Sequence, residues 1–476
     1  MPVPPAAAPP ATPAPLIWLR PQEVRALRGG LDAVPLLNDN NPELIQAPGV
    51  LLSTFPTPAG RSPQVHLDRS LSGRFDLFSH HVVKGLAEQP QATLWLGVVA
   101  SSRRATPVTL RLLAGSTALS QSSDPAQPSA PFLPLPGLMP QEDAMVFSGP
   151  GSRVAAELLA KVTTAIAPSG PLPAGPWILQ PGAPTVLMAL PIPVRHLVPP
   201  LNGRNLQLRF DSDGPVSVAT LAQFGGDQAP DPVSWQTLLA GPLSPKEHAA
   251  SPRGAAGPLI YSRVSGVQRG SLWRAVLSDP GQQDLAVPAA PISWPISSLE
   301  RGRLGSGQVQ SAELSAFYPG TAWAAHGNYG VEYDLTLPLV NRSQRPAQLA
   351  LSLDSPLKSD TAIGGLRFRS KPGPLVTFRG TVIVQGLDAD AGPGAGPQRA
   401  FHLQLLQGEA GPALGLVNLA PGERRRLRLR LLYPADATPP QVLTLSPLLA
   451  ARPAPQPAPI PAPLPSNRSP QPGARL

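Results

Sequence analysis

Apolar and polar residues alternate in short runs along most of this chain, and one arrangement of these runs occurs twice. In the first copy, a polar turn separates the apolar runs 94–101 and 107–113. About 240 residues later, the runs 335–341 and 346–353 repeat this arrangement. Alternation with a period of two is typical of a strand with one buried face. Each copy therefore predicts a strand, a turn and a second strand.

A Pro-Gly pair followed by a further apolar run lies downstream of each copy, at residues 181–193 and 421–434. The interval between the prolines that begin the second and third runs differs by one residue between the two copies. Short alternating strands separated by turn signals are characteristic of β-sandwiches. The repeat therefore predicts two related modules in tandem.

We accordingly predict an all-β protein made of two tandem β-sandwich (Ig-like) modules, with long Pro/Gly-rich loops and one short helix. The expected parts of the chain are a disordered Pro/Ala arm (1–15), a first β-sandwich module (16–224), a connecting segment with strands (225–300), a second β-sandwich module (301–450) and a disordered Pro-rich tail (451–476).

Three local features refine this outline. The pattern predicts the helix from Arg153 to Ile166, with Ser152 as its N-cap, and a helical turn at 235–239. The clearest hairpin joins two alternating runs through the turn Asp211–Gly214. We expect this hairpin to close the first module.

Composition supports the β assignment and limits the chemistry. The 476 residues include 67 prolines and 43 glycines, a density that excludes a mainly helical protein because proline breaks helix interiors. Cysteine is absent, which excludes disulfides, a thiolate nucleophile and a zinc site built on sulfur. The net charge of +9 permits binding to polyanions.

The chain shows no targeting or membrane-spanning segment. No apolar run approaches the ~20 residues that span a bilayer. Residues 1–15 lack the basic start and apolar core of a signal peptide. On this evidence the protein is either cytosolic or has its true start upstream of Met1.

Several segments together carry a resemblance to a known family. They are residues 19–25, 49–56, 75–81, 149–153, 191–195, 201–204, 325–330 and 437–442. Over residues 16–446 the chain resembles a cyanobacterial domain-of-unknown-function family, number thirty-three seventy. The family has no established activity and supplies no catalytic residues. Its members usually look exported, so the resemblance implies a periplasmic or cell-envelope location although no signal peptide is visible.

Aromatic and amide side chains gather in one segment, at Trp323, His326, Asn328 and Tyr329. Aromatic faces beside polar amides can bind sugars, so these four residues are a candidate ligand site. The alternative is a packed interdomain loop, and we favour it because buried Tyr and Trp with a bonded polar end are common.

The densest charge in the chain is a run of arginines at residues 424–430. In a strand, Arg424, Arg426, Arg428 and Arg430 share one face, and Arg425 lies on the other. Glu423 is the only acidic residue in the run, so we expect little local compensation. The stripe is either an anion-binding surface for an acidic glycan or partner, or a solvated outer face.

Two other groups of polar side chains could bind metal ions, but their sequence patterns support such sites only weakly. Asp76 and His80 share a strand face and could join the distant His66 or His326 at a metal, but no metal-binding spacing is present. The Asp-rich segments 38–41, 211–214 and 388–392 could bind calcium, and we interpret them as turns. We predict no metal site, no cofactor and no catalytic group.

These observations favour a non-enzymatic structural or interaction protein of the cell envelope. Its expected partners are envelope glycans or other envelope proteins, and not nucleic acid. One alternative is a carbohydrate- or polyanion-binding module. Another is a cell-wall hydrolase whose site is assembled from residues far apart in the sequence.

Overall fold

The computed structural model describes residues 17–57, 65–86, 92–122, 133–135, 146–161, 172–389 and 392–448. Within these ranges the chain forms 28 strands and two helices, which confirms the all-β prediction. The predicted Pro/Ala arm at 1–15 and Pro-rich tail at 451–476 lie outside the described residues.

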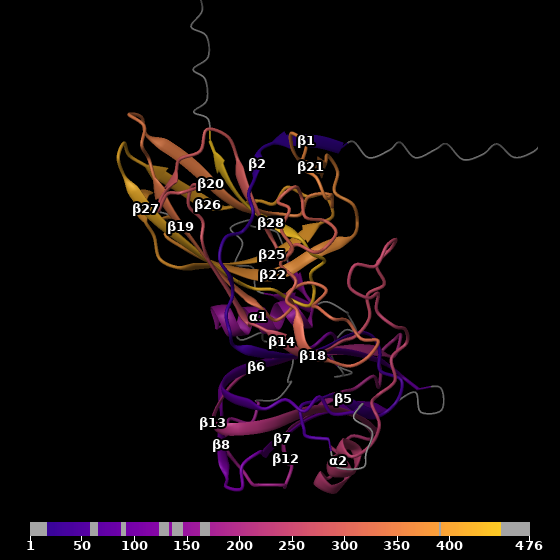
Figure 1. Cartoon of the computed structure of the whole chain (residues 1–476). Helices are drawn as coiled ribbons and strands as arrows, with labels where there is room; N and C mark the ends of the chain where they lie inside the picture. Colours follow the sequence, from indigo (N-terminus) through magenta and orange to yellow (C-terminus); the bar gives the residue numbers. More distant parts are fainter. Residues whose placement is uncertain are drawn as a thin grey trace, which may run out of the picture.

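One ten-stranded sheet forms the unit drawn in the lower half of Figure 1. Its strands are β4 (Pro35–Leu44), β5 (Gly49–Ser53), β6 (Leu71–Lys84), β7 (Thr93–Ser102), β8 (Val108–Leu119), β11 (Trp177–Leu179), β12 (Thr185–Ile192), β13 (Leu201–Gly225), β14 (Val264–Arg269) and β18 (Leu314–Phe317). The first half of β13 pairs with β6 and β8, and its second half pairs with β5 and β7. The sheet therefore bends around one apolar core.

Two further sheets form the other unit. The seven-stranded sheet contains β3 (Gly30–Leu31), β15 (Leu272–Val276), β16 (Leu285–Ala286), β19 (Glu332–Val340), β22 (Val376–Gln385), β25 (Arg399–Leu406) and β27 (Arg424–Leu432). The five-stranded sheet contains β2 (Glu23–Val24), β17 (Ile292–Ile296), β20 (Ala347–Asp354), β26 (Ala413–Leu419) and β28 (Gln441–Pro447).

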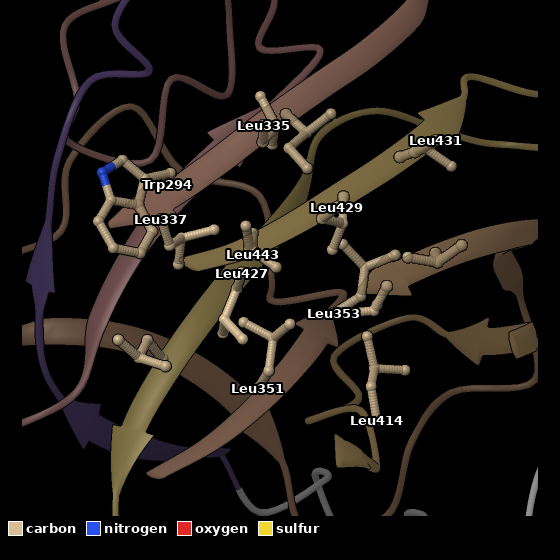
Figure 2. Close-up of a cluster of buried hydrophobic side chains, with 14 of the residues drawn as sticks. Trp294, Leu335, Leu337, Leu351, Leu353, Leu414, Leu427, Leu429, Leu431 and Leu443 are labelled. Atoms are coloured by element: carbon tan, nitrogen blue, oxygen red, sulfur yellow. The ribbon is translucent and has the colours of Figure 1, made fainter. Parts of the chain in front are cut away.

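Both sheets contribute leucines to one buried cluster (Figure 2). Leu335 and Leu429 come from the seven-stranded sheet, and Leu351 and Leu443 come from the five-stranded sheet. Their neighbours along each strand point away from this cluster, which is the period-two pattern visible in the sequence. Three short pairs complete the structure: β1 (Ile17–Pro21) with β21 (Gly365–Arg369), β9 (Leu133–Leu135) with β10 (Val146–Ser148), and β23 (Asp388–Ala389) with β24 (Gly392–Ala395).

The two units share one strand order. The order β11-β8-β13-β6-β4 in the first unit corresponds to β26-β20-β28-β17-β2 in the second. In both, the first three pairings are antiparallel and the last is parallel. Corresponding strands also follow each other in the same sequence order, and β7 pairs with β12 as β19 pairs with β27.

The strand pairing does not follow the predicted domain boundaries. Strands β1, β2 and β3, expected in the first module, pair with β21, β17 and β15 of the second unit. Figure 1 shows β1 beside β21. Conversely, β14 pairs with β4 and β18 pairs with β14, so these two strands extend the sheet of the first unit. The segment 225–300, expected as a connection, thus supplies strands to both units. Edge strands of two residues carry no periodicity that a sequence pattern could reveal.

The hairpin predicted at Asp211–Gly214 is wrong, because β13 runs through this segment as one strand. Its register shifts between Ser212 and Val216. The Ser212 hydroxyl donates to the carbonyl oxygen of Gly214 at 2.9 Å, and the Asp213 carboxylate accepts from the backbone N–H of Thr109 at 2.8 Å. These bonds stabilise an irregularity within a strand, which has the same residue preferences as a turn.

Helix α1 (Pro150–Ala160) lies between the two units (Figure 1). Gly149 is its N-cap, so the prediction of Ser152 was wrong. The cap comes instead from Asp436, whose carboxylate accepts hydrogen bonds from the backbone N–H and the hydroxyl of Ser152, at 2.7 and 2.9 Å. Val154 and Leu159 of the helix pack with Ala118 of the first unit and with Ile383 and Leu432 of the second. The helix therefore joins the two units.

Helix α2 (Pro232–Leu239) contains the helical turn expected at 235–239. The Asp231 carboxylate caps it by accepting from the backbone N–H groups of Val233 and Ser234. Trp235 and Leu239 of this helix pack on Val99 and Leu221, so α2 covers the outer face of strands β7 and β13.

Candidate functional site

The structure separates the four residues of the predicted aromatic site. Trp323 and His326 line a pocket, whereas Asn328 and Tyr329 lie outside it. Asn328 is fully buried, its amide nitrogen donates to the carbonyl oxygen of Gln310, and its amide oxygen accepts from the N–H of Ala312. The Tyr329 hydroxyl donates to the carbonyl oxygen of Ala437 at 2.9 Å. These two side chains hold the surrounding loops together.

The pocket, which we call the aromatic pocket, is formed by five segments of the chain. Its lining comes from residues 250–252 and 259–261, from Leu299 and Glu300, from Val309 and Ser311, and from residues 322–326. The Ser251 backbone N–H donates to the carbonyl oxygen of Ile260 at 2.9 Å, which closes the loop between the first two segments. The Ala322 N–H donates to the carbonyl oxygen of Arg263, which ties this loop to the last segment.

Three aromatic rings face this pocket. Tyr261 is 42% exposed, and its ring meets that of His326 edge to face with 4.6 Å between centroids. Trp323 is partly buried, and the guanidinium of Arg253 lies over its ring at 4.3 Å from the centroid. An ion pair of 2.6 Å with Glu313 orients Arg253. The rings are thus positioned before any ligand arrives.

His326 is held in a neutral form. Its Nε2 lies 2.6 Å from the carbonyl oxygen of Ser262, to which a neutral imidazole donates. Burial lowers the pKa of His326 to about 4, because desolvation penalises the imidazolium. At neutral pH this ring therefore offers the pocket an uncharged aromatic edge.

Exposed apolar side chains surround the mouth of the pocket. Ile260 is 54% exposed and Val309 is 44% exposed, and both line it together with Tyr261. This part of the site is not evident from the sequence, because the apolar run at residues 259–264 has the same local pattern as a short strand. In the structure β14 begins only at Val264, so Ile260 and Tyr261 belong to a loop that reaches the pocket.

The arginine stripe has the predicted alternation. Arg424, Arg426 and Arg428 of β27 are exposed and Arg430 is partly exposed, while Arg425 and Leu427 are buried. The predicted lack of compensation is wrong, however. Asp334 accepts two hydrogen bonds of 2.7 Å from Arg428, Glu332 lies 2.7 Å from Arg430, and Asp284 lies 2.6 Å from Arg424. Glu332 and Asp334 belong to the neighbouring strand β19, so proximity along the sequence could not reveal them.

The residues considered for a metal site do not assemble one. Arg74 binds the Asp76 carboxylate at 2.9 Å, and Asp39 binds the ring of His81, on the other face of β6, at the same distance. Among the described residues, no three His, Asp or Glu side chains are placed to hold a metal ion.

The Asp-rich segments have structural partners. Residues 38–41, expected as a turn, lie within strand β4, where the Asn38 amide donates to Gln268 at 2.8 Å. The Asp388 carboxylate accepts from both the backbone and the side-chain amide of Asn418 and pairs with Arg425 at 3.1 Å. These bonds explain how the acidic side chains are accommodated in buried positions.

Comparison with protein families assigns most of the chain to one of them. The family described as "Protein of unknown function (DUF3370)" matches residues 22–447 of the chain. No curated protein matches it. Within the described residues, no helix has both the length and the apolar character needed to cross a membrane.

Proposed function

The chain belongs to the DUF3370 family of proteins of unknown function, and we propose that it is a non-enzymatic interaction protein of the cell envelope that binds a saccharide in its aromatic pocket. The observation that carries the proposal is the convergence of Tyr261, Trp323 and His326 on one concave, mainly apolar site. Such sites, with a few polar groups among aromatic side chains, are where proteins hold small ligands.

The chemistry of the lining favours a sugar over a purely apolar ligand. The rings of Tyr261 and Trp323 offer flat apolar surfaces to the C–H faces of a pyranose. Glu300, Ser251 and Ser311 add oxygen atoms that can bond sugar hydroxyls. The exposed apolar rim leaves room for a chain of sugars to continue past the pocket.

The pocket favours binding over hydrolysis. Glycoside hydrolysis ordinarily uses a pair of carboxyl groups that flank the scissile bond. Among the described residues that line the aromatic pocket, Glu300 is the one carboxylate. Burial lowers the pKa of His326 to about 4 and its Nε2 donates to Ser262, so the ring is a weak base that is poorly suited to general-base catalysis at neutral pH.

A glycan array with labelled protein tests the proposal. We expect parent protein to bind an envelope saccharide, and Tyr261→Ala and Trp323→Ala to bind it about fivefold more weakly, since each loses a ring contact worth about 1 kcal/mol. Phe317→Ala is the matched control, because Phe317 is 40% exposed and lies outside the lining. Chromatography should recover the saccharide uncut. Equal binding by all four proteins, or cleavage, would contradict the proposal.

The envelope location has separate support, from the resemblance to a family whose members usually look exported. Cell fractionation with sequencing of the mature N-terminus tests it. We expect the protein in the periplasmic or outer-envelope fraction, and recovery in the cytosol alone would rule this location out.

We further infer that the two units are duplicated β-sandwich modules of Ig-like type. The shared order of five strands, with the same pairing directions, supports this relationship. The strands of the sequence repeat also correspond, since β7, β8 and β12 are the counterparts of β19, β20 and β27. Superposition of the two units in a crystal structure should align these strands in register, and a different strand order would refute the duplication.

A further inference from the structure

A network of arginines and carboxylates covers the outer face of the seven-stranded sheet. Each of three carboxylates in it contacts two arginines. The pairs are Arg342 and Arg424 at Asp284, Arg209 and Arg430 at Glu332, and Arg274 and Arg428 at Asp334. Arg209 also lies 3.9 Å from Asp76, which Arg74 neutralises. With Arg426, the network around the three carboxylates has seven arginines against three acids.

Among the residues that the structure describes, this imbalance leaves four positive charges without a carboxylate in the network. The arginines of β27 lie in one line, with ~6.6 Å between alternate residues of the strand. Sharing one carboxylate between two guanidinium groups leaves donor N–H groups free on both, because each guanidinium has five. The face is therefore both positively charged and rich in oriented donors.

Arg426 lies at a groove in this face. The groove is lined by Arg274 of β15, by Arg426 and Arg428 of β27, and by Gln385 and Gly386 at the end of β22. Arg426 is exposed, and in the described part of the chain it makes no ion pair with a carboxylate. Arg274 is 71% exposed, and its Nε lies 3.8 Å from Oδ2 of Asp334. This distance is long for an ion pair, so the Arg274 side chain is able to turn toward the groove.

We propose that this groove binds the carboxylate groups of an acidic polysaccharide. Arg426 makes the primary contact, because its planar guanidinium matches a carboxylate with two parallel hydrogen bonds. Arg274, which lines the same groove from β15, supplies a second donor, and Arg428 is held in place by its two bonds to Asp334. A polymer suits the site better than a single anion, because Arg424 and Arg426 lie on one line and can meet successive acidic residues.

The groove shares no lining residue with the aromatic pocket, so this inference does not depend on the proposed saccharide there. The proposed site also differs from the stripe expected from the sequence, in which Arg424, Arg426, Arg428 and Arg430 would contribute alike. Arg424, Arg428 and Arg430 have carboxylate partners, and Arg426 and Arg274 supply the capacity for an added anion.

Binding of polygalacturonate by the full chain tests the proposal, measured by titration calorimetry at low and at high salt. We expect binding at low salt that weakens at high salt, no binding of neutral dextran, and about tenfold weaker binding by Arg426→Gln. The control is Arg195→Gln, which removes the same charge from an exposed arginine outside the groove and should change the affinity less than twofold. Both variants should keep the parent melting temperature, because exposed substitutions usually cost little.

Three results would overturn the proposal. The first is no binding of polygalacturonate, and the second is equal weakening by Arg426→Gln and Arg195→Gln, which would indicate a general charge effect. The third is tighter binding of single-stranded DNA than of polygalacturonate, lost in Arg426→Gln, which would assign the groove to nucleic acid.

Discussion

Neither half of the chain should fold when the two halves are produced separately as fragments 17–224 and 225–448. The first fragment lacks β14 and β18, which extend its sheet, and the second lacks β2 and β3, which pair with β17 and β15. The second also loses Leu27, which is buried in its core. Since a domain is stable by only about 5–15 kcal/mol, loss of edge strands and core contacts removes most of that margin.

Circular dichroism and thermal unfolding of each fragment measure this effect. We expect weak β signal and no cooperative transition from either fragment alone. Mixing the two under refolding conditions is the control, and it should restore a transition near that of the intact chain. A fragment 225–448 that unfolds cooperatively at the parent temperature would show that the exchanged strands are dispensable.

Shortening Leu429 to alanine should lower the free energy of unfolding by about 2–5 kcal/mol. Leu429 is fully buried, and it lies among leucines of both sheets of the second unit (Figure 2). Its replacement removes apolar contacts and leaves a cavity that the two packed sheets cannot easily close.

The free energy of unfolding of Leu429→Ala is measured by urea unfolding, with Leu416→Ala as the control. Leu416 is also on a strand of this unit, but it is 38% exposed, so its truncation should cost less than about 1 kcal/mol. Similar losses for the two variants would mean that the sheets are not packed against each other through Leu429.

The strand content of the fold could be predicted from the sequence because alternation is a local property. Strand β27 shows this clearly, since the buried and exposed positions of residues 424–429 follow the alternation of the sequence. Long-range partners have no such signal. The cap of α1 comes from Asp436, 284 residues beyond Ser152, and the partners of Arg428 and Arg430 come from β19.

The candidate site was predictable only in part for the same reason. Composition located the aromatic segment, and the structure places Trp323 and His326 of that segment in a pocket. Composition alone could not show that Asn328 faces the interior, because the burial of one residue depends on neighbours such as Gln310 and Ala312. Tyr261 was missed because a loop rich in apolar residues has the same local pattern as a short strand.

The most direct test of the proposed function is a crystal structure of the protein with the saccharide that binds best on the glycan array. We expect one sugar ring to lie against Tyr261 and Trp323, with its hydroxyl groups within hydrogen-bonding distance of Glu300 or Ser311. A saccharide bound elsewhere on the protein, with the aromatic pocket empty, would contradict the proposal.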